Sequence, residues 1–317
     1  MKTSSKFLFH EGELPAGYKP VPHQWLFNTA SHREGQSATG WHSYYLLKEQ
    51  SNHAWAEVHF CLLNQEALSP YKAPFGSFQF HGPLNMDQRF YFIQKVEQML
   101  AAKGAKKIVV KNPPRFYSPT DLSSLEVMLF NRGYAAVQAE IGAGISTSSR
   151  RFEDGLHAWE KRKLKQARQA GLKSKHLPLS KQNEIYQFIA GCRQEKNQPL
   201  SMTGEELAGA IRRNASHFHL FANYKGKDIA AAAVAILTSH HVLYTFYYAH
   251  ARPFDAVSPV VLLMQFIYQW AKKHRVQWID LGTSHLDGEP NFPLLDFKLH
   301  LGAQPASKLT FEKVLKP

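Results

Sequence analysis

The sequence predicts an α/β protein of two domains, each a mixed twisted sheet flanked by helices, with a cleft between them. Three observations carry this prediction. The chain has 317 residues, more than the usual size of one hydrophobic core. Hydrophobic residues make up 44% of it and aromatic residues 13%, which is ample for packed cores. Finally, the order of helix, strand and glycine-ended segment in the first half recurs in the second.

In the first half, apolar residues between positions 91 and 100 have helical spacing, and Gly104 ends that helix. A strand follows over residues 107–110. Residues 129–134 resemble residues 298–303, so a tandem duplication is favoured over two unrelated α/β units. We place the boundary in the small polar stretch at residues 146–149.

In the second half, residues 229–237 form a compact apolar run and residues 242–248 are β-branched and aromatic, which predicts antiparallel strands. Ser258 and Pro259 predict a helix start, because serine accepts an orphan N–H and proline lacks one. The apolar helical spacing continues to the lysine pair at 272–273, and a further strand follows over residues 276–281.

The charge of the chain indicates an anionic partner. Its formal net charge is +13, and a basic helix at residues 161–171 concentrates part of it. Lys161, Lys165 and Arg168 fall on one stripe of that helix, and we expect them to bind an acceptor or another anion. The alternative is a solvated helix face. The apolar residues expected to face the core are Phe152, Leu156, Trp159, Leu164 and Ala167.

Several classes of function are disfavoured by what the sequence lacks. The two cysteines provide no disulfide framework, the N-terminus has no signal-peptide pattern, and no apolar stretch is long enough for a membrane span, so we expect a cytoplasmic protein. The 17 histidines show no metal-ligand spacing, so no metal is expected. Motifs typical of dedicated nucleic-acid-binding domains are also lacking.

Two pieces of the second half resemble a known family. The helix that begins after Ser258 runs into WAKKHRVQWIDLG over residues 270–282 and then FKLHLGA over residues 297–303, and the basic helix ends in Gly171. This order resembles the second domain of the Fem-type peptidoglycan bridge enzymes and, more broadly, the GCN5-related N-acetyltransferase (GNAT) superfamily. The resemblance implies tandem GNAT-like domains: a degenerate one over residues 1–148 and an acyltransferase domain over residues 149–317.

The function implied by the resemblance is transfer of an acyl or aminoacyl group from an activated donor to an amine. Acetyl-CoA or another acyl-CoA is the expected donor, because residues 177–214 lack the long helical arm of many tRNA-dependent Fem enzymes. Two alternatives stay open. One is tRNA-dependent aminoacyl transfer to a peptidoglycan precursor. The other is a non-catalytic binding protein that retains the GNAT fold.

The donor site is expected in the loop at residues 251–259, before the helix N-terminus that would hold a phosphate. This loop lacks the glycines of the superfamily, a departure that puts tight coenzyme A binding in doubt and supports the binding-protein alternative. Arg252 and the backbone amides of Val257 and Ser258 are the candidate phosphate ligands. A plain helix cap is the alternative role for Ser258.

The catalytic candidates are Lys298, Asp280 and Tyr248. The family lysine corresponding to Lys298 helps to hold donor or acceptor. Alternation along a strand at residues 297–303 would leave Lys298 on an open face, beside Asp280 at the end of its strand. Tyr248, or its neighbour Tyr247, could donate a proton to the leaving thiolate. The alternatives are a surface lysine and packing tyrosines.

In the first half, Tyr71 and Lys72 are candidates for contact with an acidic acceptor. They begin a Pro-Phe-Gly turn that leads into an aromatic alternating stretch at residues 77–80. An ordinary turn into a strand is the alternative interpretation.

Overall fold

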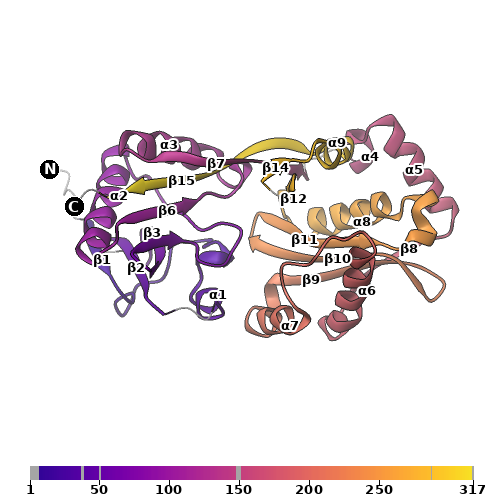
Figure 1. Ribbon diagram of the computed structural model, residues 1–317, viewed down its shortest axis with the longest axis horizontal. Coiled ribbons are helices and arrows are strands. Elements are labelled where there is room, and N and C mark those ends of the chain that lie inside the picture. Colours follow the sequence, from indigo (N-terminus) through magenta and orange to yellow (C-terminus); the bar gives the residue numbers. More distant parts are fainter. Residues whose placement is uncertain (1–6, 37–38, 50, 148–150, 287, 316–317) are drawn as a thin grey trace. The chain divides into compact units, whose positions relative to one another are not determined.

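The computed structural model describes residues 7–36, 39–49, 51–147, 151–286 and 288–315 (Figure 1). The chain divides into two compact units. Unit 1 comprises the chain up to Ala139 and again from Ser307, and unit 2 comprises Glu140 to Ala306. Ser148 and Ser149, half of the expected boundary stretch, lie outside the described residues.

Unit 1 is a mixed sheet with strands in the order β1-β2-β3-β4-β6-β15, and β5 pairs with β3. β4 and β6 are parallel, whereas the other neighbouring pairs are antiparallel. Helices α2 and α3 belong to this unit (Figure 1). Its elements are β1 (Phe7–Glu11), η1 (Leu26–Asn28), α1 (Ala30–Glu34), β2 (Trp41–Lys48), β3 (Ala54–Leu63), β4 (Glu66–Ser69), β5 (Gln79–Phe80), α2 (Met86–Ala102), β6 (Lys107–Lys111), η2 (Arg115–Tyr117), α3 (Pro119–Asn131), the start of β7 (Ala135–Ser146) and most of β15 (Gln304–Val314).

Unit 2 is a second mixed sheet, in the order β7-β12-β11-β10-β9-β8, with a separate two-stranded sheet of β13 and β14. Here β11 and β12 are the parallel pair. Besides the rest of β7 and the start of β15, its elements are α4 (Phe152–Gly155), α5 (Ala158–Gln169), β8 (Lys173–Leu177), η3 (Leu179–Lys181), α6 (Gln182–Gln194), α7 (Gly204–Arg213), η4 (Ala215–His217), β9 (Phe218–Lys225), β10 (Asp228–Ser239), β11 (Val242–His250), η5 (Arg252–Val257), α8 (Pro259–Lys273), β12 (Trp278–Thr283), β13 (His285–Leu286), β14 (Glu289–Pro290) and α9 (Phe292–His300).

The two units repeat one order of elements. In unit 1 the antiparallel strands β2, β3 and β4 are followed by α2 and by β6, which is parallel to β4. In unit 2 the antiparallel strands β9, β10 and β11 are followed by α8 and by β12, which is parallel to β11. The predicted repetition of a mixed sheet flanked by helices is therefore confirmed.

The last strand of each half of the sequence begins in one unit and ends paired with a strand of the other unit. β7 follows β6 and α3 along the chain, yet its residues 142–146 pair with β12 of unit 2. β15 follows α9, yet its residues 310–314 pair with β6 of unit 1. The expected domains, residues 1–148 and 149–317, did not include this exchange of strands.

The core of unit 2 explains why the run at residues 229–237 does not alternate. β10 contacts α8 and also α6, so both of its faces are covered. Ala230 to Ala235 are 0% exposed, and their small side chains let helices approach the strand closely. A strand buried on both faces is apolar throughout rather than at every second residue.

Two sequence-based expectations are wrong. Residues 297–303 are not a strand, because Phe297 and Lys298 belong to helix α9, whose first turn is capped by the Asn291 side chain accepting from the Leu294 N–H at 3.0 Å. Short apolar runs do not distinguish strand from helix. Trp159, expected in the core, is 55% exposed.

Candidate functional site

The candidate site lies in unit 2, where the parallel strands β11 and β12 stop pairing. Their pairing joins Val242–Tyr244 to Trp278–Asp280, although β11 continues to His250 and β12 to Thr283. Both strands have irregular registers at this level. β11 has one extra residue against β10 between Tyr244 and Tyr247, and the register of β12 with β7 shifts between Asp280 and Thr283. Bulges terminate strand pairing and redirect side chains. Beyond Tyr244 and Asp280, β11 and β12 are therefore no longer paired with each other.

Gly282 lies in the irregular part of β12 and has to be glycine for two reasons. Its φ of +73° is in the left-handed region, which a side chain disfavours. A Cβ atom there would also lie 3.3 Å from the ring of Tyr244. The backbone of β12 thus passes close to a tyrosine on the neighbouring strand.

Lys298 of α9 binds the irregular end of β12. Its Nζ donates to the carbonyl oxygen of Gly282 at 3.1 Å and to that of Thr283 at 2.8 Å, and the residue is only 2% exposed. Burial lowers the pKa of Lys298 to about 8, and the negative charge of Asp280 opposes this shift. Lys298 therefore does not stand on the open face predicted for it, because α9 is a helix and directs it inward.

Asp280 is held between β11 and the next turn of β12. Its Oδ1 accepts from the Gly282 N–H at 2.7 Å, and its carbonyl oxygen accepts from the Thr245 hydroxyl at 2.9 Å. The residue is 3% exposed. Asp280 and Lys298 are thus brought to the same end of β12, as the sequence suggested, whereas a direct pair between them stays a prediction.

Tyr244 is a member of this group that sequence reasoning missed. It lies opposite Asp280 in the parallel pair, with its ring against Gly282. Burial, reinforced by the negative charge of Asp280, raises the pKa of Tyr244, so its hydroxyl stays protonated. Only the register of two strands separated by a helix reveals this neighbour, and no local pattern encodes that register.

Tyr248, the tyrosine predicted instead, lies further along β11, opposite Ala233. Burial raises its pKa, against the opposing effect of Arg193. Its neighbour Tyr247 is 5% exposed, and its hydroxyl lies 2.6 Å from the Ser201 hydroxyl, which is a packing role. Both follow the bulge of β11.

A cavity of about 560 Å³ lies among α6, α7 and the segment that connects them. Arg193 and Ser201 belong to its lining, and these are the residues that interact with Tyr248 and Tyr247. The cavity therefore adjoins the part of β11 beyond its bulge. Its volume suits a small organic molecule, for which pockets of roughly 300–1,000 Å³ are typical.

The predicted donor loop is a 3-10 helix, η5. The Arg252 guanidinium donates to the Glu195 carbonyl at 2.7 Å and pairs with its carboxylate at 3.2 Å. Pro259 begins α8 as predicted, and Ser258 is the N-cap position with φ +46°, but within the described residues its side chain caps no backbone N–H. The predicted capping contact of the Ser258 side chain is therefore wrong. Phosphate binding by Arg252, Val257 and Ser258 stays a prediction.

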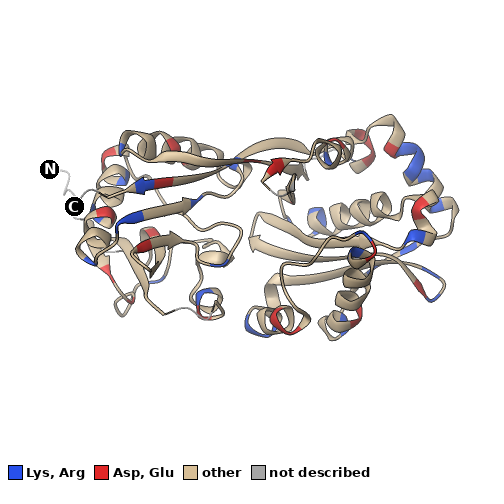
Figure 2. Cartoon of the chain, in the orientation of Figure 1, with Lys and Arg blue, Asp and Glu red and all other residues tan. Residues whose placement is uncertain are grey.

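The basic helix is α5, and the three cations singled out in it are exposed. Lys161, Lys165 and Arg168 all face solvent, and Arg168 pairs with Glu153 at 2.7 Å. Figure 2 shows lysine and arginine gathered along this helix. The exposed Trp159 lies beneath the Arg162 guanidinium, 4.3 Å from ring centroid to Cζ.

Tyr71 and Lys72 belong to unit 1, unlike the other candidates. Lys72 is exposed, with its Nζ 5.3 Å from the centroid of the Tyr71 ring. Its backbone N–H donates to the Gln36 side chain at 2.6 Å. The strand expected here is short, β5, because residues 71–78 are irregular.

In the described part of the chain, no group of three or more His, Cys, Asp or Glu side chains is arranged to hold a metal ion. None of the helices found there has the length and apolar character needed to cross a bilayer.

Comparison with known proteins relates this chain to others through structure. No protein-family model matches the sequence, and no curated protein matches it. The crystal structure of FemX superposes with a TM-score of 0.71, covering 93% of each chain at 11% identity. The C-terminal domain of a putative lysylphosphatidylglycerol synthetase from Agrobacterium fabrum gives 0.55 at 13% identity, covering 81% of this chain and 80% of that one. The L-PGS of Bacillus licheniformis gives 0.53 at 11% identity with the same coverage. The chain thus shares the fold of FemX.

Proposed function

We propose that the protein is an N-acyltransferase that moves an acyl or aminoacyl group from an activated donor to an amine. The observation that carries this proposal is the group at the end of the β11–β12 pairing: Lys298, Asp280 and Tyr244 around Gly282. A buried cation whose pKa is lowered to about 8 and a phenol kept protonated, each interacting with Asp280, are the kind of perturbed groups that active sites contain.

Each side chain has a role in the proposed step. The acceptor amine attacks the acyl carbonyl carbon, so that a C–N bond forms and the bond to the leaving group breaks. The Lys298 ammonium, with two N–H groups on β12 carbonyls, stabilises the negative charge that develops on the carbonyl oxygen. Asp280 takes the proton that the amine loses. Tyr244, or Tyr248 further along β11, donates one to the leaving sulfur or oxygen.

The cavity beside Tyr247 and Tyr248 is the proposed place for the acceptor. Arg193 in its lining would favour an acceptor that carries a carboxylate or phosphate as well as its amine. The exposed cations Lys161, Lys165 and Arg168 of α5 would add long-range attraction for such an anion.

The donor we expect is acetyl-CoA or another acyl-CoA, with its phosphates on Arg252 and the amides of Val257 and Ser258. A second candidate, an aminoacyl-tRNA, is favoured by a specific observation. The loop is a 3-10 helix without glycine, Arg252 is already bound to Glu195, and the Asp255 carboxylate lies in the same loop. FemX and the putative lysylphosphatidylglycerol synthetase share the fold, and the latter name denotes an aminoacylated lipid.

The test is a donor screen with the full chain. Acetyl-CoA, longer acyl-CoAs and charged tRNA are each incubated with a mixture of primary amines, and acylated products are identified by mass spectrometry. We expect one donor class to give a product, and Lys298→Met to lower its rate at least about tenfold, or roughly 1.4 kcal/mol of transition-state stabilisation.

The matched control is Lys313→Met, which removes another largely buried lysine, paired with Glu97 at 2.8 Å in unit 1. This variant should retain the wild-type rate. Equal losses in both variants would assign the effect to stability, and saturable donor binding without any product would favour the non-catalytic binding protein.

A further inference from the structure

Unit 1 contains a cavity of about 450 Å³ that the proposed transfer does not use. It is formed by β1, α1, β2 and the loop between β1 and η1. The polar side chains that line its inner part include Gln24, Arg33, Trp41, Ser43 and Tyr45. The volume is within the range of small-molecule sites, so the question is which ligand these side chains fit.

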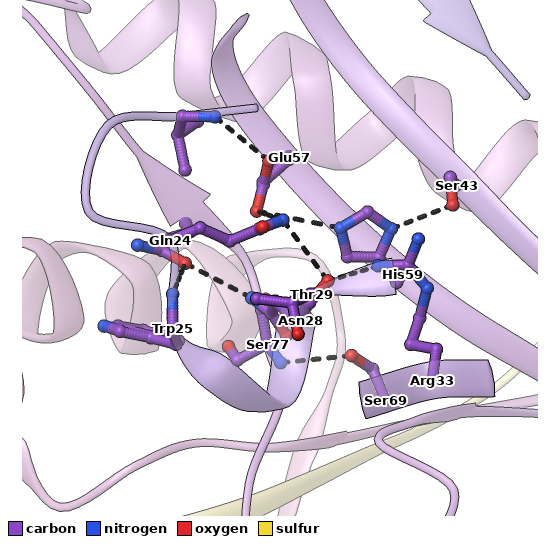
Figure 3. Close-up of polar contacts among 12 residues, drawn as sticks. Gln24, Trp25, Asn28, Thr29, Arg33, Ser43, Glu57, His59, Ser69 and Ser77 are labelled. Atoms are coloured by element: carbon purple, nitrogen blue, oxygen red, sulfur yellow. Dashed lines mark hydrogen bonds and ion pairs between the residues drawn. The ribbon is translucent and has the colours of Figure 1, made fainter. Parts of the chain in front are cut away.

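A buried layer of polar groups fixes the lining from behind (Figure 3). Glu57, which is 0% exposed, accepts from the Gln24 side chain at 2.6 Å and from the Val21 N–H at 3.1 Å. His59, 2% exposed, lies 2.9 Å from the Ser43 hydroxyl and 3.7 Å from the Glu57 carboxylate. Lining residues held by fully buried partners have fixed orientations, which is the property of a prepared binding site.

Arg33 is anchored as part of this arrangement. Its guanidinium donates to the Asn28 carbonyl (Figure 3), and it also interacts with the Tyr45 hydroxyl and with the charge of Glu57. A guanidinium has five N–H donors, so these contacts leave others for a ligand in the cavity. The geometry keeps Arg33 at the cavity wall rather than in bulk solvent.

Trp41 provides the observation that points to a missing acceptor. Its indole Nε1 is buried and, within the described residues, has no hydrogen-bond partner. Leaving a buried donor unpaired costs about 1–3 kcal/mol. The Arg33 Cζ lies 5.9 Å from the centroid of the Trp41 ring, so the two side chains are neighbours in the wall of this cavity. A carboxylate, with two oxygens, matches two such donors.

The rim of the cavity has the opposite charge. Glu11, Glu13 and Glu34 line it, and Glu11 is partly neutralised by Lys103 at 2.9 Å. A simple anion would be repelled by these carboxylates and by Glu57 behind the wall. A ligand with a carboxylate inside and an ammonium group at the rim satisfies both ends.

We propose that this cavity binds a small zwitterion of the α-amino-acid class. Arg33 and the Trp41 indole receive its carboxylate, and the rim glutamates attract its ammonium group. Because the site lies wholly within unit 1, the inference does not rest on the proposed acyl transfer.

The experiment is calorimetric titration of the full chain with individual free L-amino acids, without any acyl donor. We expect saturable binding of at least one of them. Its N-acetyl form, which lacks the ammonium charge, and its amide, which lacks the carboxylate, should each bind at least about tenfold more weakly. Equal binding of either derivative, or no saturable binding of any amino acid, overturns the proposal.

Protein variants locate the site. Trp41→Phe keeps an aromatic ring but removes the donor, and should weaken binding about three- to tenfold. The matched control is Trp55→Phe, which removes an indole N–H bonded to Ser51 at 3.2 Å, away from the cavity. Arg33→Gln should abolish binding, but it also breaks the Asn28 contact. The comparison of Trp41→Phe with Trp55→Phe is therefore the test of the site. If Trp41→Phe and Trp55→Phe bind the amino acid with equal affinity, the proposed location of the site is wrong.

Discussion

At the scale of single residues, the proposed mechanism rests on Lys298 of α9. Burying an ammonium group disfavours its charge, and the two β12 carbonyls and Asp280 restore only part of that loss, so the pKa of Lys298 falls to about 8. Replacing it leaves two carbonyls without this partner. Removing Lys298 should therefore also lower the free energy of unfolding by about 1–3 kcal/mol, which removal of an exposed lysine would not do.

The pH dependence of Lys298 separates its two roles. If the ammonium form assists transfer, the rate should fall as pH rises through about 8. Stability should respond in the opposite sense. The folded pKa lies below the ordinary 10.5, so between pH 8 and 10.5 the unfolded chain binds more protons and the stability contribution of Lys298 rises with pH. Denaturant unfolding at pH 7.5 and 9.5 measures this, and the rise attributable to Lys298 should be lost in Lys298→Met. A wild-type rate that is flat through pH 8 would contradict the role in catalysis.

A histidine cluster predicts sensitivity to acid. His219 packs 4.4 Å from the Trp270 ring and near His176, and burial, with repulsion by neighbouring histidines, lowers the pKa of His219 to about 4. Below pH 6.5 the unfolded chain takes up the proton first, so this contribution to stability is lost as pH falls from 6.5 towards 4. His219→Phe should therefore show a smaller fall in Tm between pH 7 and 5 than the wild type. An unchanged fall would exclude His219 as the cause.

At the scale of elements, the irregular ends of β11 and β12 create the site. Regular pairing would continue past Asp280 and close the ladder, whereas the two register shifts end it there. The following helix, α9, then supplies Lys298 to the carbonyls of β12. The geometry thus depends on one glycine as well as on charged groups.

Substituting that glycine tests the element directly. Gly282→Ala should cost about 1–2 kcal/mol for the left-handed backbone and also displace the Tyr244 ring, which lowers transfer. Gly226→Ala is the matched control, because its φ is +63° and no atom lies within 4 Å of the added Cβ. We expect thermal destabilisation in both variants, larger at Gly282 because of the Tyr244 contact, but a loss of transfer only at Gly282. Equal activities would show that the bulge does not serve catalysis.

Helix α5 is the element expected to attract an anionic ligand. Lys161→Glu with Lys165→Glu should weaken binding of a phosphate-bearing ligand at low salt, and the stability should change by only about 0.5 kcal/mol because both residues are exposed. Lys225→Glu with Lys227→Glu makes the same change of charge at an exposed turn of unit 2. If both double variants bind this ligand equally well, α5 is an ordinary solvated helix.

At the scale of the whole molecule, local patterns predicted elements better than their partners. Pro259 predicted the start of α8, and the lysine pair at 272–273 predicted its end. The apolar residues within 107–110 predicted the strand β6. The repeated order of elements was also readable, and FemX confirms the fold. The exchange of β7 and β15 was not predictable, because strand pairing between distant segments leaves no signal in one sequence. The same limit hid Tyr244, which lies near Asp280 only through register.

The central claim is that unit 2 transfers an acyl or aminoacyl group through the site around Lys298. The most direct measurement is the rate of label transfer from acyl-CoA or charged tRNA to an amine, compared between wild type, Lys298→Met and Lys313→Met. We predict product from one donor class, a rate at least about tenfold lower for Lys298→Met, and an unchanged rate for Lys313→Met. Product formed equally by wild type and Lys298→Met, with both variants folded, would contradict the claim.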